Sequence, residues 1–397
     1  MKVLHVGIKN WPFDSAFEQK DARGGGSNKY CDMLLHAFPD EVESHIITQL
    51  APNQTKRELQ GNFRIYRIRT IGGRAFRQIL ANFISLVIAF HVIRKTKIDL
   101  LHGHMLVGIV GAFLLGKIFR LPVVGTPYSV VTTEFKFPVN KIANALERFF
   151  YTRVSRIVFE TEENLLEARR RLKARFQNST VIVTGIRCPD LSEKRLGKTE
   201  RINIFFIGRI VNIKAIDNLV NGIAELGKEY RARVHLDIVG EGEEFDSICK
   251  IIEESDLRDV VRMHGFVLDP TPIFLNADIF ILPSHMEGLS IALLEAMSYE
   301  IACIINNFGV PFDDSTVYKL QNNEAVTIAR AIRNFVDDPT LIRKYGSRAR
   351  KEILNNFSIE TFAKNYLMMY ETALHEHVDH TENIPLARES KECRLYS

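Results

Sequence analysis

Short apolar runs rich in β-branched residues alternate with longer segments of helical period along most of the chain. In the first half, the runs that predict strands cover residues 3–8, 45–48, 63–68, 100–102, 123–125, 156–159 and 181–183. In the second half they cover residues 202–207, 234–239, 261–264, 279–282 and 302–305. Strands that alternate with helices form parallel sheets covered on both faces. The pattern therefore predicts an α/β fold.

A polar segment from Arg187 to Arg201, which contains Pro189 and Gly197, interrupts this alternation. Such a segment is typical of an exposed connection between domains. We therefore expect two doubly wound, Rossmann-like domains, over residues 1–188 and 202–357, joined by a linker over 189–201. Parallel sheets of this kind bind ligands at the carboxyl ends of their strands, so the two domains should face each other across a central cleft.

The end of the chain loses its apolar period after about Leu374. We expect a last helix over 359–374 and a flexible tail over 375–397. The tail contains three histidines, but surface histidines without ordered partners rarely form a metal site.

Composition and charge limit the classes of binding partner and the cellular location that we expect. The chain of 397 residues is 46% hydrophobic, enough for two cores, and its formal net charge is only +4, which argues against nucleic acid as a partner. Its five cysteines are scattered without a CxxC pair, as expected of reduced thiols. Only six residues separate Lys2 from Lys9, too few for the apolar core of a signal peptide. We expect a cytoplasmic location.

The longest apolar run, residues 80–93, contains Asn82 and His91 and is shorter than the roughly 20 residues of a membrane span. A buried helix is the simpler interpretation. The run is flanked on both sides by basic residues, as in interfacial helices, so a peripheral membrane contact is a second interpretation. These residues are Arg74, Arg77, Arg94, Lys95 and Lys97.

Two glycine-rich segments differ in what they predict. Gly24, Gly25 and Gly26 lie between the first strand and a helix expected over 30–37, where free backbone N–H groups could meet a phosphate or a sugar. A surface turn is the alternative. The segment from Gly240 begins like a dinucleotide fingerprint, but Phe245 replaces its third glycine and the acidic residues between would repel a pyrophosphate.

Arg209 and Lys214 follow the first strand of the second domain. Two cations at a strand end are suited to neutralise a diphosphate leaving group, although solvated cations at strand ends are also common.

Glu287 and Glu295 follow the strand at 279–282. A helix continuing from Glu287 would bring them to one side with a rise of about 12 Å, a separation that suits a nucleotide sugar. One carboxylate could bind sugar hydroxyls and the other ribose, while backbone N–H groups of Gly288, Leu289 and Ser290 meet the phosphates. Two solvated glutamates on an amphipathic helix are the alternative.

Taken in order, these segments resemble a family 4 glycosyltransferase of the GT-B fold, a group marked by an E-x7-E motif. The segments are ARGGGSNKY, IDLLHGH, VTGIRC, IGRIVNIK, IVGEGEEF, MHGFV and ADIFILPSHMEGLSIALLEAM. The last helix resembles the one that crosses back onto the N-terminal domain in this fold.

The resemblance implies a donor site in the second domain. Arg209 and Lys214 would bind the donor diphosphate, Glu295 the ribose and Glu287 the donor sugar. Phe266 and Val267 would frame the base through backbone atoms. The family is mostly retaining and needs no metal. The sequence agrees, because it contains no D-x-D pair to hold a divalent cation on a diphosphate. We expect neither a cofactor nor a metal.

The sequence departs from the family pattern at several positions. Where the family has T-x-H, this chain has Thr126, Pro127 and Tyr128, and Tyr128 could donate a hydrogen bond to the acceptor. Ala215 replaces the usual glycine after the lysine, and Glu300 replaces the glycine after the E-A-M segment. These changes indicate a divergent member.

His102 and His104 lie two residues apart in a predicted strand, so their side chains share one face. His104 is a candidate for contact with donor or acceptor, and a buried, hydrogen-bonded histidine is the alternative.

We therefore expect a retaining, metal-independent glycosyltransferase that moves a sugar from a nucleotide-sugar donor to a glycan, polysaccharide or lipid-linked acceptor. Its catalytic candidates are Glu287, Arg209, Lys214 and His104. Two other functions are open, a sugar-nucleotide 2-epimerase of the same shape and a non-catalytic relative that binds nucleotide sugars.

Overall fold

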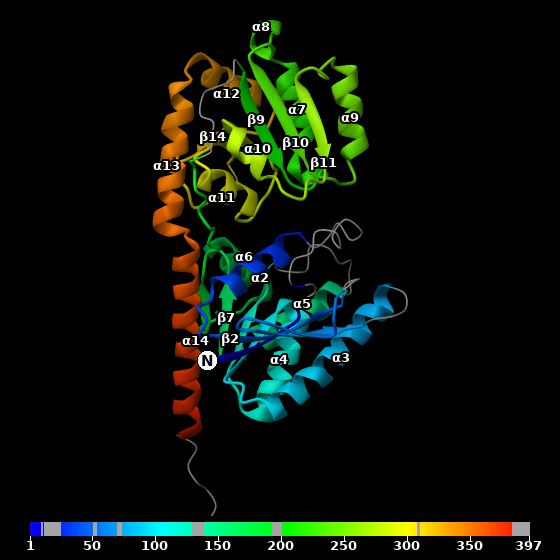
Figure 1. Ribbon diagram of the computed structural model, residues 1–397, viewed down its shortest axis with the longest axis vertical. Coiled ribbons are helices and arrows are strands. Elements are labelled where there is room, and N and C mark those ends of the chain that lie inside the picture. Colours follow the sequence, from blue (N-terminus) through cyan, green and yellow to red (C-terminus); the bar gives the residue numbers. More distant parts are fainter. Residues whose placement is uncertain are drawn as a thin grey trace, which may run out of the picture. The chain divides into compact units, whose positions relative to one another are not determined.

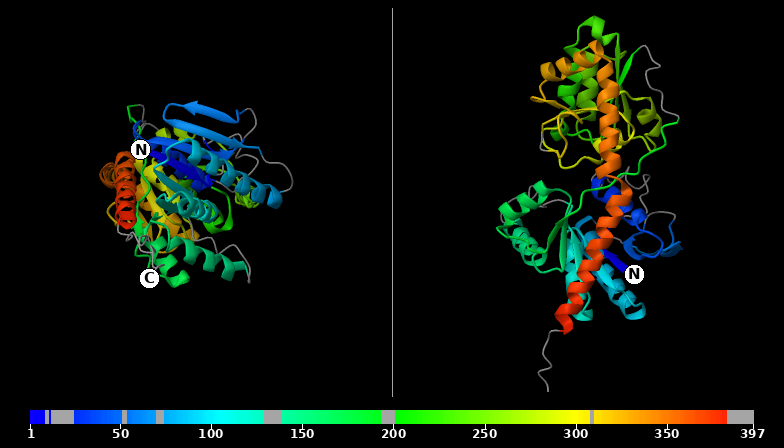
Figure 2. Two further views of the ribbon diagram at one scale, coloured as in Figure 1. Left: turned by 90° about the horizontal axis from the view of Figure 1, so that it is seen from below. Right: turned by 90° about the vertical axis from the view of Figure 1, so that its left-hand side faces the viewer.

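We describe the protein from a computed structural model (Figures 1 and 2). The described residues are 1–8, 11, 25–50, 54–69, 74–128, 139–192, 201–307 and 310–382. The chain folds into two compact units. Unit 1 comprises Met1–Trp11, Phe38–Ile182 and Lys364–Ser397, and unit 2 comprises Pro12–Ala37 and Val183–Ala363. The predicted arrangement about a cleft and the exact domain limits stay predictions, and residues 193–200 of the expected linker lie outside the described residues.

Unit 1 is built on an eight-stranded sheet in the order β3-β4-β2-β1-β5-β6-β7-β8. Its strands are β1 (Lys2–Val6), β2 (Glu43–Gln49), β3 (Arg57–Gln60), β4 (Phe63–Ile68), β5 (Leu100–His104), β6 (Val123–Thr126), β7 (Arg156–Phe159) and β8 (Ser179–Val181). All neighbours are parallel except β3, which pairs antiparallel to β4.

The helices of unit 1 cover both faces of this sheet (Figure 1). They are α3 (Arg74–Lys95), α4 (Met105–Phe119), α5 (Val139–Tyr151), α6 (Glu162–Leu172) and, from Lys364 onward, α14 (Ile359–Glu382). Strand alternation sends Leu4 and Leu101 into the apolar core with α3 and α4. It sends His5 and His102 to the other face, where His102 meets Tyr370 of α14.

The last helix, α14, is longer than the sequence predicted. The helix continues to Glu382, eight residues beyond the predicted end at 374, so the tail expected from 375 begins in a helix. Side chains in this stretch bind other segments of unit 1, since Glu376 forms an ion pair with Arg156 and the His377 imidazole donates to the Arg120 carbonyl over 2.9 Å. These polar contacts hold a segment that has no apolar period in the sequence.

Unit 2 contains a six-stranded parallel sheet in the order β11-β10-β9-β12-β13-β14. The strands are β9 (Ile202–Ile207), β10 (Val234–Val239), β11 (Val261–Gly265), β12 (Ile279–Leu282), β13 (Ala302–Asn306) and β14 (Tyr318–Leu320). Its helices are α2 (Gly25–Ala37), α7 (Ile216–Ala224), α8 (Lys228–Arg231), α9 (Phe245–Glu254), α10 (Thr271–Asn276), α11 (Ile291–Ser298), α12 (Ala325–Asp337), α13 (Thr340–Asn356) and the first residues of α14. Two parallel α/β sheets confirm the predicted fold class.

None of the helices in the described part of the chain combines the length and apolarity that a bilayer span requires.

Candidate functional site

The strand order of unit 2 reverses between β9 and β12. Successive strands run from β9 to β10 and β11 on one side, and from β12 to β13 and β14 on the other. Loops that leave the carboxyl ends of two such strands diverge and form a ligand crevice. The loop after β9 carries Arg209 and Lys214, and the loop after β12 carries Glu287. The topology therefore places three predicted site residues at one position of the sheet edge.

An ion pair joins these two loops. Lys214 Nζ contacts Glu287 Oε2, and the two side chains keep only 15% and 19% of their surface exposed. The Ser284 hydroxyl donates to the same Glu287 oxygen over 3.3 Å, and the His285 backbone N–H donates to the Ile213 carbonyl over 2.9 Å. A partly buried charge pair interacts more strongly than an exposed one, so it fixes the relative position of the loops. Arg209 lies on the same loop as Lys214 and is exposed.

Two asparagines support the loop after β12. Asn306, the last residue of β13, donates to the Ser284 carbonyl over 3.0 Å, and Asn323, shortly after β14, donates to the Pro283 carbonyl over 2.9 Å. Sequence reasoning missed Ser284 and both asparagines. Polar residues at the ends of neighbouring parallel strands were the signal that could have found them.

The glycines after β10 position the loop that carries Arg209. Gly240 has a φ of +138°, and a Cβ atom on it would lie 1.8 Å from the Gly208 carbonyl oxygen. The Gly208 N–H donates to the Val239 carbonyl, and the Ile210 N–H donates to the Glu241 carbonyl. Close backbone approach between the two loops therefore explains Gly240 without a dinucleotide.

Glu295 lies on helix α11, whereas Glu287 precedes the start of that helix. Ser290 caps α11, its hydroxyl accepting from the Leu293 N–H over 3.4 Å, and the helix begins at Ile291. Glu287 therefore belongs to the loop, and the rise calculated for a continuous helix does not apply. Glu295 lines a pocket of about 420 Å³ whose other lining residues are Asp32, Met33, His36, Ile186, Arg187, Ser298, Tyr299 and Ile359.

The remaining predicted donor residues lie after β11, on the loop that carries Glu287 and at the start of α2. Phe266 and Val267 follow β11 and are half-buried. Gly288 and Leu289 belong to the loop before α11. Gly25 and Gly26 form the start of α2, so the helix expected over 30–37 begins at Gly25 instead, and Gly24 lies outside the described residues.

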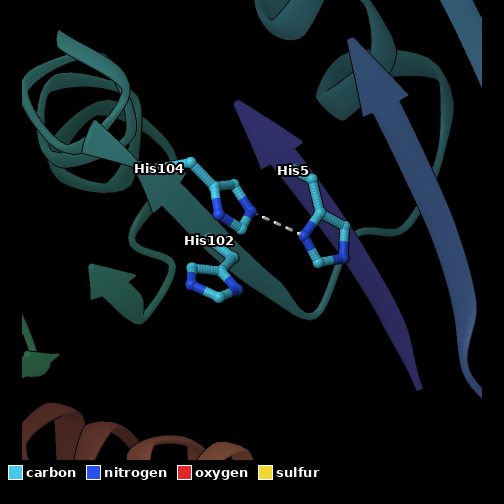
Figure 3. Close-up of side chains that lie close together, drawn as sticks. All are labelled: His5, His102 and His104. Atoms are coloured by element: carbon cyan, nitrogen blue, oxygen red, sulfur yellow. Dashed lines mark hydrogen bonds between the residues drawn. The ribbon is translucent and has the colours of Figure 1, made fainter. Parts of the chain in front are cut away.

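Three histidines form a buried cluster in unit 1 (Figure 3). His5 comes from β1, and His102 and His104 come from the adjacent β5, with at most 1% of each side chain exposed. The rings of His102 and His104 lie 4.0 Å apart, which confirms that they share one face. His5 was missed because nothing near it in the sequence marks a site.

Hydrogen bonds extend this cluster to four hydroxyl groups. His5 Nδ1 lies 3.0 Å from His104 Nε2, and His104 Nδ1 lies 2.5 Å from the Tyr128 hydroxyl after β6. His102 bonds to Tyr370 over 2.6 Å and to Thr126 over 2.9 Å, and Thr126 bonds in turn to Tyr366. Burial lowers the pKa of all three histidines, that of His104 to about 3, because a charged imidazole would lose its hydration. The cluster is therefore neutral at pH 7.

Hydrogen bonds occupy most of the ring nitrogens in this cluster. One nitrogen from each of the three rings lies within 4.8 Å of the other two. Five of the six ring nitrogens already have hydrogen-bond partners. The expected absence of a metal stays a prediction.

Two family models cover most of the chain. Residues 24–188 match the model described as Glycosyltransferase Family 4, and residues 189–352 match the one described as Glycosyl transferases group 1. The chain belongs to glycosyltransferase family 4. Its similarity to solved structures shows the GT-B fold that the sequence predicted.

Relatives of this family 4 glycosyltransferase include two proteins of Staphylococcus aureus. A poly(ribitol-phosphate) alpha-N-acetylglucosaminyltransferase is 27% identical over 44% of this chain and 36% of its own length. The capsular polysaccharide biosynthesis glycosyltransferase CapM is 28% identical over 44% of this chain and 47% of its own length. The chain thus spans less than half the length of either relative. Among solved structures, Anabaena HepE in complex with UDP and glucose has a TM-score of 0.73 at 15% identity, covering 94% of this chain and 100% of HepE.

In this family 4 chain, the predicted residues form two separate groups. Lys214 and Glu287 are in contact, with Arg209 on the same loop of unit 2. His104 and Tyr128 are in contact in unit 1. His104 is buried, whereas its neighbour Tyr128, two residues after the end of β6, is half-buried.

Proposed function

We propose that the protein is a retaining, metal-independent glycosyltransferase that moves a sugar from a nucleotide-sugar donor to a glycan, polysaccharide or lipid-linked acceptor. The ion pair between Lys214 and Glu287 at the strand reversal of unit 2 carries this proposal, because it brings a phosphate-binding cation and a sugar-binding carboxylate together. The names of the two Staphylococcus relatives and the UDP and glucose bound to HepE support the choice of donor and acceptor classes.

On the donor, Arg209 and Lys214 would neutralise the charge that develops on the leaving diphosphate. The bond between the sugar C1 and the phosphate oxygen breaks, and a bond from the acceptor oxygen to C1 forms on the same face. The proton of the acceptor hydroxyl passes to the leaving phosphate. Glu287 would accept hydrogen bonds from the sugar hydroxyls once Lys214 turns to the phosphate.

The other donor contacts follow the family pattern. Glu295 would hold the ribose, and the backbone N–H groups of Gly288, Leu289 and Ser290 would meet the phosphates. Gly25 and Gly26 at the start of α2 would add further N–H donors. Phe266 and Val267 would frame the base.

On the acceptor side, we assign the contact to Tyr128. His5 Nε2 is buried and has no hydrogen-bond partner among the described residues. An unpaired buried acceptor is more common than an unpaired buried N–H, so we place the His5 proton on Nδ1, where it is donated to His104. His104 then donates from Nδ1 to the Tyr128 oxygen, and we assign the Tyr128 hydroxyl as the donor to a ligand oxygen. His104 is thus a positioning residue in this proposal.

For the location, we propose the cytoplasm with a peripheral contact to a membrane surface. The basic residues that flank α3 support this part of the proposal.

The donor test begins with thermal shifts of the full chain in UDP, GDP, ADP and their sugars. One nucleotide series should stabilise the protein, by about 2.7 kcal/mol at 100 times its dissociation constant. With that donor and an acceptor, sugar transfer should retain the anomeric configuration and persist in a chelator. Lys214→Ala and Glu295→Gln should each lower donor binding or turnover at least about tenfold, or about 1.4 kcal/mol. Lys344→Ala, which changes an exposed cation on α13, is the matched control.

Each contrary outcome identifies a different error. Epimerised donor without acceptor would make the protein a 2-epimerase, and nucleotide binding without sugar release under any acceptor would make it a non-catalytic relative. Loss of activity in the chelator would contradict the role of Arg209 and Lys214. Unchanged kinetics in both variants would overturn the site assignment.

A further inference from the structure

Three neighbouring helices of unit 1 carry large apolar side chains on their solvent-facing sides. Phe83 of α3, Ile118 of α4 and Ile142 of α5 keep 64%, 62% and 61% of their surface exposed. Further exposed apolar residues recur on the same helices at helical spacing, so each helix has a second apolar stripe opposite its buried face. These are Val87 and Phe90 on α3, Val107 and Leu114 on α4, and Leu146 and Phe149 on α5.

Aromatic contacts join the three helices into one surface. Phe90 of α3 lies 5.0 Å from Phe119 of α4, between ring centroids. Phe113 of α4 lies 5.3 Å from Phe150 and 6.2 Å from Phe149, both on α5. Helix α4 packs between the other two, and Figures 1 and 2 show α3 and α4 side by side. We call this surface the α3–α4–α5 face.

The charge of this face has one sign. The three helices contain a single acidic residue, Glu147, which is fully buried and paired with Arg171. Their basic residues are exposed wherever their side chains are described. The described cations on the helices or directly after them are Arg94, Lys95, Lys97, Lys117, Arg120, Lys141, Arg148 and Arg153.

Three of these cations lie near aromatic rings of the face, of which Phe149 and Phe90 are exposed and Phe113 is half-buried. The Arg153 guanidinium lies 4.1 Å from the Phe149 ring centroid, and Lys117 Nζ lies 5.6 Å from that of Phe113. Arg94 lies 6.0 Å from Phe90. An apolar ring beside a cation suits the boundary between acyl chains and anionic headgroups, where each group meets its preferred environment.

We propose that the α3–α4–α5 face binds the surface of a bilayer that contains anionic lipids. The apolar side chains enter the boundary between headgroups and acyl chains, and the cations bind lipid phosphates. A second copy of the chain fits less well, because a two-fold contact through this face would oppose cations with cations. This assignment does not depend on the transferase activity, since binding requires neither donor nor acceptor.

The test is co-sedimentation of the full chain with vesicles of phosphatidylcholine, alone or with about one third phosphatidylglycerol. Binding should require the anionic lipid and should weaken between about 0.1 and about 0.5 M salt, because salt screens the cations. The triple variant Phe83→Ser, Ile118→Ser, Ile142→Ser should bind at least about tenfold more weakly, because three apolar side chains no longer enter the bilayer. Lys117→Glu with Arg148→Glu should have a similar effect.

Matched controls lie on other helices. Val326→Ser, Leu354→Ser, Met368→Ser changes residues that are 53%, 50% and 56% exposed on α12, α13 and α14. Arg343→Glu with Lys344→Glu changes two exposed cations of α13. Both controls should bind vesicles as the wild type does. Absent binding, equal binding of triple variant and control, or sedimentation as a dimer that the triple variant abolishes would each overturn the proposal. Circular dichroism confirms that each variant is folded.

Discussion

Tyr128 has both an unusual backbone conformation and a short hydrogen bond to a buried histidine. Its φ of +60° lies in the left-handed region, which a bulky side chain rarely adopts, and its hydroxyl lies 2.5 Å from the buried His104. Such a conformation costs of order 1–3 kcal/mol and persists only where surrounding contacts hold it. The bond to His104 is such a contact, and it holds the hydroxyl beside the carboxyl end of β5.

Tyr128→Phe therefore should lower kcat at least about tenfold, because the ring stays in place while the donor to the ligand oxygen is lost. Donor dissociation constants should not change, since the proposed donor residues lie in unit 2. Steady-state kinetics and donor titration measure the two effects. Tyr370→Phe is the control, because it also removes a hydrogen bond to an imidazole but lies on α14. It should cost about 1 kcal/mol of stability and leave kcat unchanged, whereas wild-type kcat in Tyr128→Phe would exclude the assigned role.

Glu300 shows why the family has a glycine at this position. Glu300 has a φ of +59° directly after the C-cap of α11. The Glu300 N–H donates to the Met297 carbonyl and the Ile301 N–H to the Ala296 carbonyl, the pattern of a Schellman motif. Glycine adopts this conformation without a steric cost.

Glu300→Gly should raise the free energy of unfolding by about 0.5–1 kcal/mol, because the relief of the left-handed strain exceeds the entropy that glycine adds to the unfolded chain. Urea denaturation measures this change. Glu300→Ala separates the backbone effect from the contacts of the carboxylate, since it removes the carboxylate and keeps the Cβ atom. If alanine stabilises as much as glycine, the backbone explanation is wrong.

At the scale of elements, the packing of the loops after β9 and β10 depends on Gly240. In Gly240→Ala the new Cβ would overlap the Gly208 carbonyl, and the φ of +138° would be strained as well. We expect a loss of at least about 3 kcal/mol of stability, measured by urea denaturation, and weaker donor binding because the Arg209 loop moves. Gly227→Ala is the control, since nothing lies within 4 Å of its Cβ position and its φ is −60°. An equal loss of stability in both variants would show that the packing of these loops does not depend on glycine at position 240.

Most strands could be predicted because each contains several buried apolar residues. The strands at 202–207, 234–239 and 279–282 coincide with β9, β10 and β12, whose apolar runs need no partner to be recognised. Strand β3, with the sequence RELQ, was missed because all four residues are exposed and only pairing with β4 makes it a strand. The extension of α14 was missed for a related reason, since polar contacts with unit 1 hold it.

The candidate site could be predicted where one segment carries its own signal. Lys214 and Glu287 were found from separate motifs, and the strand order then brought them into contact across 73 residues. His5 carries no local signal and joins His104 across 99 residues, so only the pairing of β1 with β5 reveals it. The supporting asparagines were missed because each acts on the backbone of a distant loop.

At the scale of the molecule, unit 1 encloses neutral imidazoles that make its stability sensitive to acid. The lowered pKa values of His5, His102 and His104 mean that the unfolded chain binds protons that the folded chain excludes. Their stabilisation is complete above about pH 6.5 and is lost as the pH falls toward the folded pKa, about 3 for His104. Glu160 acts in the opposite direction, because burial raises its pKa to about 8 and its folded form gains a proton as the pH falls from there.

Between pH 6 and 5 the three histidines therefore outweigh Glu160, and the free energy of unfolding should fall by about 2.4 kcal/mol per pH unit from these four groups. His5→Gln should flatten this slope by about 1.4 kcal/mol per pH unit, because one excluded proton is removed while the neutral side chain can still bond to His104. Glu160→Gln should steepen it by a similar amount. Urea denaturation at successive pH values gives both slopes. Identical slopes in the wild type and both variants would show that His5 and Glu160 do not couple folding to pH, whereas slopes that change in opposite directions would show that they do.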